Sequence, residues 1–249
     1  MIDDMPIGVD VSKWQREMDW PKDKQAGAKF AFIRAGSINM HTGVCYKDYQ
    51  LERNAELAPE QMSDCIGFYF YFRPKYSPIK QADYFWSLIR DYEWGALVVD
   101  CEAAGASYNT IRENTRTMAA AVDEMCDGRK CLIYTRASYW NSVIGNQSWA
   151  RLYDLWIARY NSYITHPWGD GYCKPLGWDF WKFWQYSADG NGMGPTYGGQ
   201  SASMDLNYFN GDLQGLNEYF GVDDEPSYDV EIRVPKNAEI INIKISREL

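Results

Sequence analysis

The stretch at residues 96–105, ALVVDCEAAG, carries two acidic residues at the end of an apolar run that has the composition of a buried strand. Asp100 and Glu102 are two positions apart, and side chains alternate across a strand, so both carboxylates are expected on one side and Cys101 on the other. Their Cα atoms would lie roughly 6.5 to 7 Å apart. When like charges share a site, the ionised group raises the pKa of its neighbour. Such a pair can provide a proton donor beside an anion.

Two further aspartates interrupt apolar strand patterns, Asp10 in GVDVS and Asp205 in SMDLN. Burying an unpaired carboxylate is costly, so a chain with four acids in strands must pair them or place them around a wet cleft. Any one acid alone could equally be a hydrogen-bonded brace for a loop, but that explanation is weaker for the group of four.

Glycoside hydrolysis is the chemistry that uses clustered carboxylates with divided roles. Glu102 has the longer side chain and is the candidate proton donor to the leaving oxygen. Asp100 beside it would orient a substrate group or stabilise positive charge on the sugar.

Aromatic side chains crowd the same predicted strand ends, and 16% of all residues are aromatic. Trp and Tyr rings suit stacking against sugar rings, although core packing explains most of them, and about half of those on alternating strands should face packing surfaces. The candidate substrate-binding residues are Trp14, Tyr69, Tyr71, Tyr134, Tyr160, Trp184 and Gln185.

Short apolar or alternating runs predict eight strands, and helical spacing predicts helices between them. The strands are expected at residues 7–12, 30–36, 66–72, 96–102, 131–136, 154–160, 180–187 and 204–209. The helices are expected at 47–58, ending before Pro59, at 78–94, and at 109–127 with Asn109 or Thr110 as its cap.

This alternation predicts the α/β class and parallel strands, and eight strands predict a closed, irregular, TIM-like β/α barrel. Residues 161–179 and 188–203 are rich in Gly, Pro, Asn and Ser, and we expect them to be loops. Helices should therefore be reduced in the second half of the barrel.

The composition excludes several classes of partner. A net charge of −9 and a pI near 4.8 disfavour electrostatic binding to nucleic acid or to an anionic membrane. No apolar run approaches the roughly 20 residues that span a bilayer, so we expect no membrane insertion. The start, MIDDMPIGVD, lacks signal-peptide features. We expect synthesis in a cytoplasm with release by lysis or holin-type export, or secretion if the start was trimmed.

The six cysteines show no CxxC pairs and no histidines at metal-ligand spacing. We expect neither a metal site nor a cofactor, and we favour reduced thiols over a disulfide framework. His41 and His166 are interpreted as surface residues distant from the acids.

A change of composition after Gly221 divides the chain into a barrel at residues 1–220 and a tail at 221–249. The tail begins with an acidic link and continues as two alternating stretches, VEIRV and IINIKI, which predict a β-hairpin or a small appended module. A fragment of a wall-binding domain and an oligomerising arm are alternatives that the sequence leaves open.

Six motifs in order, GVDVSKWQ, GFYFYFRP with QADYFW, VVDCE, LWIARY, FWQYS and MDLNYFNG, resemble those of the glycoside hydrolase family 25 lysozymes, also called Chalaropsis-type muramidases. The likeness covers about residues 6 to 220. It implies a β/α barrel lacking some helices, and hydrolysis of the β-1,4 bond between N-acetylmuramic acid and N-acetylglucosamine in peptidoglycan. It also implies Glu102 as general acid, with Asp10, Asp100, Asp205 and Tyr69 as further site residues.

One departure from the family pattern follows Tyr69. Many members have a His in a YHF run where this chain has Phe70 and then Tyr71. Phe70 cannot donate a hydrogen bond, so the difference affects either a contact in the cleft or the packing of the barrel.

The resemblance implies a retaining mechanism, assisted by the N-acetyl group of the substrate, with direct attack by a carboxylate as the alternative. The first functional hypothesis is a bacteriolytic enzyme, an endolysin of phage origin or an autolysin. A non-catalytic glycan-binding or virion structural protein on the same barrel is the second, and a chitinase-like glycosidase is the third.

Overall fold

The computed structural model describes residues 4–160, 166–167, 174–188 and 192–222. The predicted hairpin or module in the tail, and most of the loop predicted at 161–179, lie outside the described residues. Residues 192–203 form turns with one isolated bridge between Gly199 and Met18, as the loop prediction for 188–203 requires.

Eight strands close into one barrel, which confirms the predicted fold class. Each strand pairs with the next, and β1 closes the barrel by pairing with both β2 and β9. The strands are β1 (Ile7–Val11), β2 (Ala28–Ile38), β4 (Ile66–Tyr71), β5 (Ala96–Asp100), β6 (Lys130–Thr135), β7 (Asp154–Ala158), β8 (Phe183–Ser187) and β9 (Asp205–Phe209). A short strand that was not predicted, β3 (Cys45–Lys47), pairs antiparallel with the end of β2.

The prediction of parallel strands is wrong for β9. This strand runs antiparallel to both of its neighbours, β1 and β8, and Asp205, its first residue, lies opposite Asp10 of β1. The described residues of the loop before β9, 188 and 192–204, contain no crossover helix, which fits a chain that enters this strand from the other end of the barrel. The start of β9 therefore lies beside the carboxyl ends of the parallel strands.

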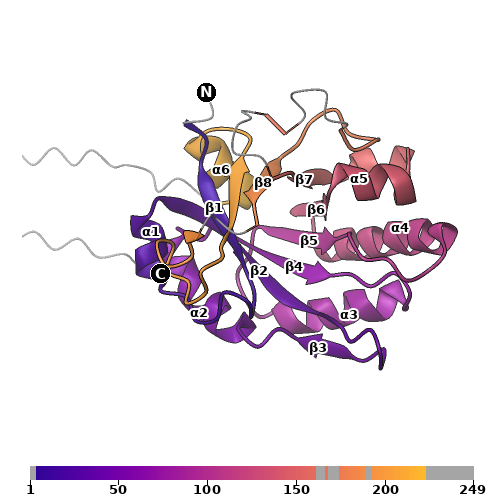
Figure 1. Ribbon diagram of the computed structural model, residues 1–249, viewed down its shortest axis with the longest axis horizontal. Helices are drawn as coiled ribbons and strands as arrows, with labels where there is room; N and C mark the ends of the chain where they lie inside the picture. The colour runs from indigo at the N-terminus through magenta and orange to yellow at the C-terminus, as the bar shows by residue number, and fades with distance from the viewer. Residues whose placement is uncertain (1–3, 161–165, 168–173, 189–191, 223–249) are drawn as a thin grey trace, which may run out of the picture.

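Helices cover the outside of the first half of the barrel (Figure 1), as predicted. They are α1 (Trp20–Gln25), α2 (Leu51–Gln61), α3 (Pro78–Ile89) and α4 (Tyr108–Met125). After β6, the described part of the chain has the short helical segments α5 (Ala137–Tyr139), η2 (Trp140–Ile144) and η3 (Ser148–Leu152), and then α6 (Leu213–Phe220). Helices α1 and α6 were not predicted from the sequence.

Two helix boundaries differ from the sequence prediction. Helix α2 starts at Leu51 and continues through Pro59. Pro59 has no backbone N–H and so removes one helical hydrogen bond near the helix end, while Ala58 and Met62 close to it are fully buried. Helix α4 is capped by Ser107, whose side chain accepts from the amide of Thr110, rather than by Asn109 or Thr110.

Alternation along the strands separates two apolar layers. On β2, Phe30 and Phe32 point into the barrel, while the alternating residues Ala31 and Ile33 pack outward against the helices. A Cβ on Gly8 of the neighbouring strand would lie 2.5 Å from the Phe30 ring, so the filled interior requires glycine there. Side chains of α6, including Phe220 against Phe30, belong to the inner layer and close one end of the barrel.

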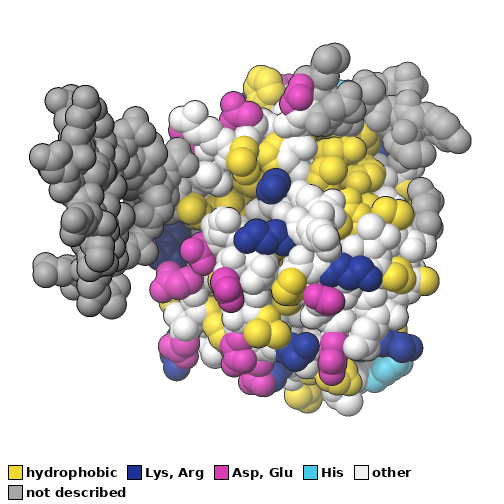
Figure 2. Space-filling view, turned by 90° about the vertical axis from the view of Figure 1, so that its left-hand side faces the viewer, with side chains coloured by type: hydrophobic (Ala, Val, Ile, Leu, Met, Phe, Trp, Pro, Cys, Tyr) yellow, Lys and Arg dark blue, Asp and Glu magenta, His cyan; other side chains and the backbone are white. Residues whose placement is uncertain are grey.

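One face of the outer surface carries side chains of both charges. Figure 2 shows acidic and basic side chains interspersed on one face, with hydrophobic side chains gathered toward its top. Among the described residues, no helix combines the length and apolar character needed to cross a membrane.

Asp23 in α1 is a buried carboxyl whose two oxygens have no hydrogen-bond partner in the described part of the chain. Burial raises its pKa well above the ordinary value. The folded state therefore holds a proton that the unfolded chain loses at lower pH, so Asp23 lowers stability as pH rises above about 4 toward its folded pKa.

We predict that Asp23→Asn raises the free energy of unfolding by about 1 to 3 kcal/mol at pH 7 and leaves it nearly unchanged at pH 3. Urea titrations at both pH values measure this difference. Asp83→Asn, at an exposed position of α3, is the matched control. An equal effect of Asp23→Asn at both pH values would contradict the account.

Candidate active site

A pocket of about 260 Å³ opens at the carboxyl ends of the parallel strands. All four predicted acids line it, together with six of the seven predicted substrate-binding residues. These residues are Asp10, Asp100, Glu102, Asp205, Trp14, Tyr69, Tyr71, Tyr134, Tyr160 and Gln185.

Strand alternation explains why acids from distant segments meet here. The inward row of β5 runs through Ala96 and Val98 to Asp100, and the same phase carries Glu102 into the pocket just beyond the strand. The backbone between the two acids is anchored at Cys101, whose N–H donates to the carbonyl of Tyr134 over 2.8 Å and whose carbonyl accepts from the Thr135 hydroxyl over 2.8 Å. The two carboxylates thus lie on a fixed segment.

Asp10 is held by two side-chain amides on neighbouring strands. Gln185 Nε2 and Asn207 Nδ2 donate to its Oδ2 over 2.7 Å and 2.9 Å. The Asn207 carbonyl oxygen accepts from the indole N–H of Trp156 over 2.8 Å, so its amide nitrogen must face Asp10. Burial raises the pKa of Asp10 to about 6, partly offset by the two amide hydrogen bonds.

Gln185 is likewise fixed from both ends. Its Oε1 accepts from the hydroxyls of Tyr134 over 2.7 Å and Tyr160 over 2.9 Å, while its amide nitrogen donates to Asp10. Gln185 is 3% exposed, so its contacts are with the protein, and it orients the residues around it.

The floor of the pocket is aromatic. Trp156 stacks on Phe32 with ring centroids 4.5 Å apart, and its edge meets Tyr134 at 4.7 Å and Tyr69 at 6.2 Å. This layer separates the apolar interior of the barrel from the acids above it. It also excludes water from one side of the carboxylates, which raises their pKa values.

The pKa values of Asp100 and Glu102 are both raised by burial. For Asp100, the charge of Glu102 adds to the increase and Arg34 opposes it. For Glu102, Arg136, Arg73 and a hydrogen bond from Tyr71 oppose the increase. Asp100 Oδ1 is buried and has no hydrogen-bond partner among the described residues. Burial of both groups and the repulsion between their charges favour a state in which the pair shares one proton and one negative charge.

The prediction that Trp184 contacts substrate is wrong. Trp184 lies between Phe183 and Gln185, both of which point into the barrel, so its ring points outward. It is 1% exposed, and its indole N–H donates to the carbonyl of Arg159 over 2.8 Å. Trp184 therefore belongs to the packing layer between barrel and surface.

Phe70 also faces outward. It is fully buried and packs on Phe85 of α3 with ring centroids 5.6 Å apart. The departure from the YHF pattern therefore concerns packing, while Tyr69 and Tyr71 on either side line the pocket.

Several residues of the site were missed by sequence reasoning. Arg34, Ser12, Trp156 and Ala188 line the pocket, and Asn207 holds Asp10. Strand alternation could have identified Arg34 as an inward-facing residue, because Arg34 follows Phe30 and Phe32 on the same face of β2. Both predicted surface histidines are exposed.

A β/α barrel with clustered carboxylates over an aromatic floor defines a glycoside hydrolase of the barrel type. The family model described as "Glycosyl hydrolases family 25" matches residues 9–194. The chain is 34% identical over 223 residues to Lysozyme M1 of Streptomyces globisporus, a match that covers 84% of this chain and 69% of that one.

Two solved structures share the fold of this chain. The bacterial lysozyme from Streptomyces coelicolor superposes with a TM-score of 0.69 at 29% identity, covering 86% of this chain and 96% of the other. A family 25 glycosyl hydrolase from Bacillus anthracis shares the fold, with a TM-score of 0.70 at 23% identity over 88% and 95% of the two chains. The chain therefore belongs to glycosyl hydrolases family 25, and it is an enzyme of the lysozyme and muramidase class.

We predict that Asn207→Ala raises the pKa of Asp10 above about 6, because the charged carboxylate loses one of its two amide hydrogen bonds. Carbon-13 NMR titration of the Asp10 carboxyl measures this directly. Asn210→Ala is the matched control, since its amide donates to the carbonyl of Trp181 instead. An Asp10 pKa that stays the same or falls would contradict the assignment of this hydrogen bond.

Proposed function

We propose that the protein hydrolyses the β-1,4 bond between N-acetylmuramic acid and N-acetylglucosamine in bacterial peptidoglycan, with Glu102 as the general acid. The observation that carries the proposal is the pair of carboxyls, the buried Asp100 and the half-buried Glu102, which line one pocket with an aromatic floor. Membership of family 25 and the likeness to Lysozyme M1 support the choice of substrate.

Position decides which member of the pair donates the proton. Asp100 is the more deeply buried, at 4% exposed, and burial raises its pKa the more strongly. Glu102 is half-buried, follows the strand end and has the longer side chain, so it can reach a leaving oxygen at the pocket mouth. The shared proton moves to Glu102 in the substrate complex when Asp100 gains a donor that stabilises its anion.

The substrate itself can supply that donor. Asp100 lines the pocket, and its buried Oδ1 has no hydrogen-bond partner among the described residues, so this carboxyl has capacity to accept the N–H of a sugar acetamide. An acetamide held in this way directs its carbonyl oxygen at the anomeric carbon. We therefore propose substrate-assisted hydrolysis with retention of configuration, a recognised exception to the scheme with a carboxylate nucleophile. Direct attack by a carboxylate is the alternative.

Asp10 and Asp205 face each other across β1 and β9 at the pocket rim. Their negative charge would stabilise the positive charge that develops on the sugar ring. Among the aromatic residues, Trp14 and Tyr160 are 67% and 55% exposed and can stack on sugars, whereas Tyr134 at 7% exposed serves as a wall.

We predict that Glu102→Gln lowers the rate of peptidoglycan hydrolysis by about 10²- to 10⁴-fold, because the amide cannot protonate the leaving oxygen. Release of soluble fragments measures hydrolysis, and co-sedimentation with intact wall measures binding, which should be retained. Glu113→Gln, at an exposed position of α4, is the control and should leave hydrolysis unchanged.

Hydrolysis by Glu102→Gln at the wild-type rate would refute the assignment of the acid. Wild-type protein that binds wall without releasing fragments would favour a glycan-binding protein. Faster release from chitin than from peptidoglycan would favour the chitinase-like alternative.

A further inference from the structure

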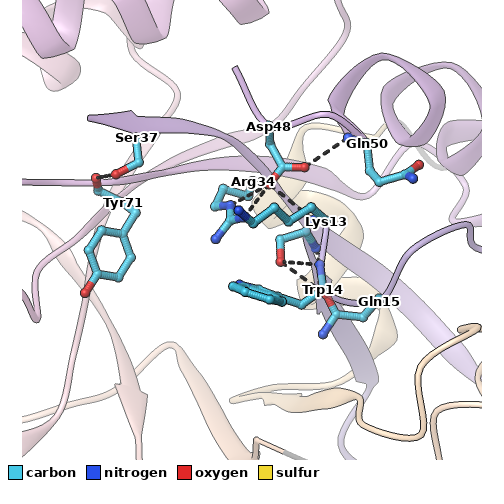
Figure 3. Close-up of polar contacts among 9 residues, drawn as sticks. Lys13, Trp14, Gln15, Arg34, Ser37, Asp48, Gln50 and Tyr71 are labelled. Carbon is cyan, nitrogen blue, oxygen red and sulfur yellow. Dashed lines mark hydrogen bonds and ion pairs between the residues drawn. The ribbon is translucent and has the colours of Figure 1, made fainter. Parts of the chain in front are cut away.

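Asp48 is a buried carboxylate outside the group of catalytic acids. It lies between β3 and α2, is 1% exposed, and accepts three hydrogen bonds. Its Oδ2 accepts from Arg34 Nε over 2.7 Å and from the backbone N–H of Lys13 over 3.2 Å, and its Oδ1 accepts from the backbone N–H of Gln50 over 3.0 Å. Figure 3 shows these partners converging on the one carboxylate. Asp48 thus joins the start of α2 to two segments that reach the pocket.

The first of these segments carries Arg34. This residue follows Phe32 in the inward row of β2, is 8% exposed and lines the pocket. Its charge lowers the pKa of Asp100 and opposes the effect of burial there. Because Asp48 pairs with the guanidinium through Nε and Nη2, it fixes where this charge stands relative to Asp100.

The second segment follows β1 and carries Trp14. The N–H of Lys13 is held by Asp48, the N–H of Trp14 donates to Ser12 Oγ over 3.3 Å, and Gln15 Oε1 accepts from the N–H of Ser12 over 2.8 Å. Lys13 Nζ lies 4.8 Å from the centre of the Trp14 ring. The exposed ring at the pocket mouth therefore stands on a backbone turn that Asp48 anchors (Figure 3).

We propose that Asp48 is a positioning residue for the reaction. One buried carboxylate sets both the Arg34 charge beside Asp100 and the Trp14 ring that stacks on substrate. The inference rests on the proposed function. A brace that only stabilised the fold would change neither the pH profile nor the Michaelis constant of the folded enzyme.

Asp48→Asn is the first test, because asparagine keeps an acceptor oxygen while it removes the charge that holds Arg34. The freed guanidinium then pairs more strongly with Asp100 and lowers the pKa of the catalytic pair. The basic limb of the profile of kcat/KM against pH should shift to lower pH, since the proton donor loses its proton earlier. The other charged groups that face Asp100, which are Glu102, Asp10 and Arg73, are unchanged in this variant.

The Trp14 segment gives a second readout. With its anchor weakened, the turn no longer holds the ring in place, so KM for peptidoglycan fragments should rise. We expect kcat/KM at the wild-type optimum to fall about 10- to 100-fold from the two effects together.

The double variant Arg34→Gln/Asp48→Asn separates the effect on the pH profile from the effect on KM. It also leaves no unpaired buried charge that could cause misfolding, because two neutral amides replace the ion pair. Arg34→Gln alone removes the charge from the pocket wall. If Asp48 acts on the acids through Arg34, the double variant should have the same basic limb as Arg34→Gln alone. Its KM should still be higher than that of Arg34→Gln.

Glu52→Gln is the matched control, because Glu52 forms an exposed ion pair with Lys47 near the start of α2 and does not line the pocket. Its profile and KM should equal those of the wild type. A folded Asp48→Asn enzyme with wild-type KM and an unshifted basic limb would overturn the proposal, as would equal shifts in the presence and absence of Arg34. A wild-type protein inactive on peptidoglycan would refute the proposed function instead, and NMR titration of Asp100 in Asp48→Asn would then test the Arg34 step alone.

Discussion

The cost of placing carboxylates above an apolar barrel interior governs the structure of this site. Phe30, Phe32 and Trp156 fill the barrel up to the layer where the acids begin, so those acids lack water on one side. A charged carboxyl there is stable only with donors or cations, and the protein supplies Asn207 and Gln185 to Asp10. Asp100 Oδ1 has no hydrogen-bond donor among the described residues. In this account, Asp100 either keeps its proton or accepts a hydrogen bond from the substrate.

The barrel topology serves the same requirement. Acids from β1, from the end of β5 and from β9 meet at one rim only because β9 runs antiparallel and begins where its neighbours end. Its next inward residue, Asn207, then reaches Asp10 from below, and its carbonyl is held by Trp156. One reversed strand thus contributes both an acid and the group that orients another acid.

The alternation of side chains along strands made most of the site predictable from sequence. Much of what was predicted wrongly concerns which face of a strand a residue occupies, or the direction in which a strand runs. The spacing of Asp100 and Glu102 was enough to put them on one face. The same rule separates Gln185 from Trp184, but only when the phase of the strand is known, and a run of aromatic residues such as FWKFWQYS hides that phase. The direction of β9 could not be read from its residues, because an antiparallel strand has the same alternation as a parallel one.

Other features depend on contacts between segments far apart in the chain. Asp48 carries no local pattern that marks it as buried, and its role emerges only when Arg34 and Lys13 fold against it. Asn207 resembles any polar residue in a strand until Trp156 fixes its amide. Helix α2 continues through Pro59 because the packing of its neighbours compensates for the lost hydrogen bond, which sequence rules for helix ends cannot weigh.

Mass spectrometry of the soluble products from purified peptidoglycan, after borohydride reduction of the new reducing ends, tests the central claim most directly. The account predicts reduced N-acetylmuramic acid at the new end, because the acid pair cleaves the bond on the reducing side of that sugar. Reduced N-acetylglucosamine at the new end, or no soluble product across a range of pH and salt, would contradict it.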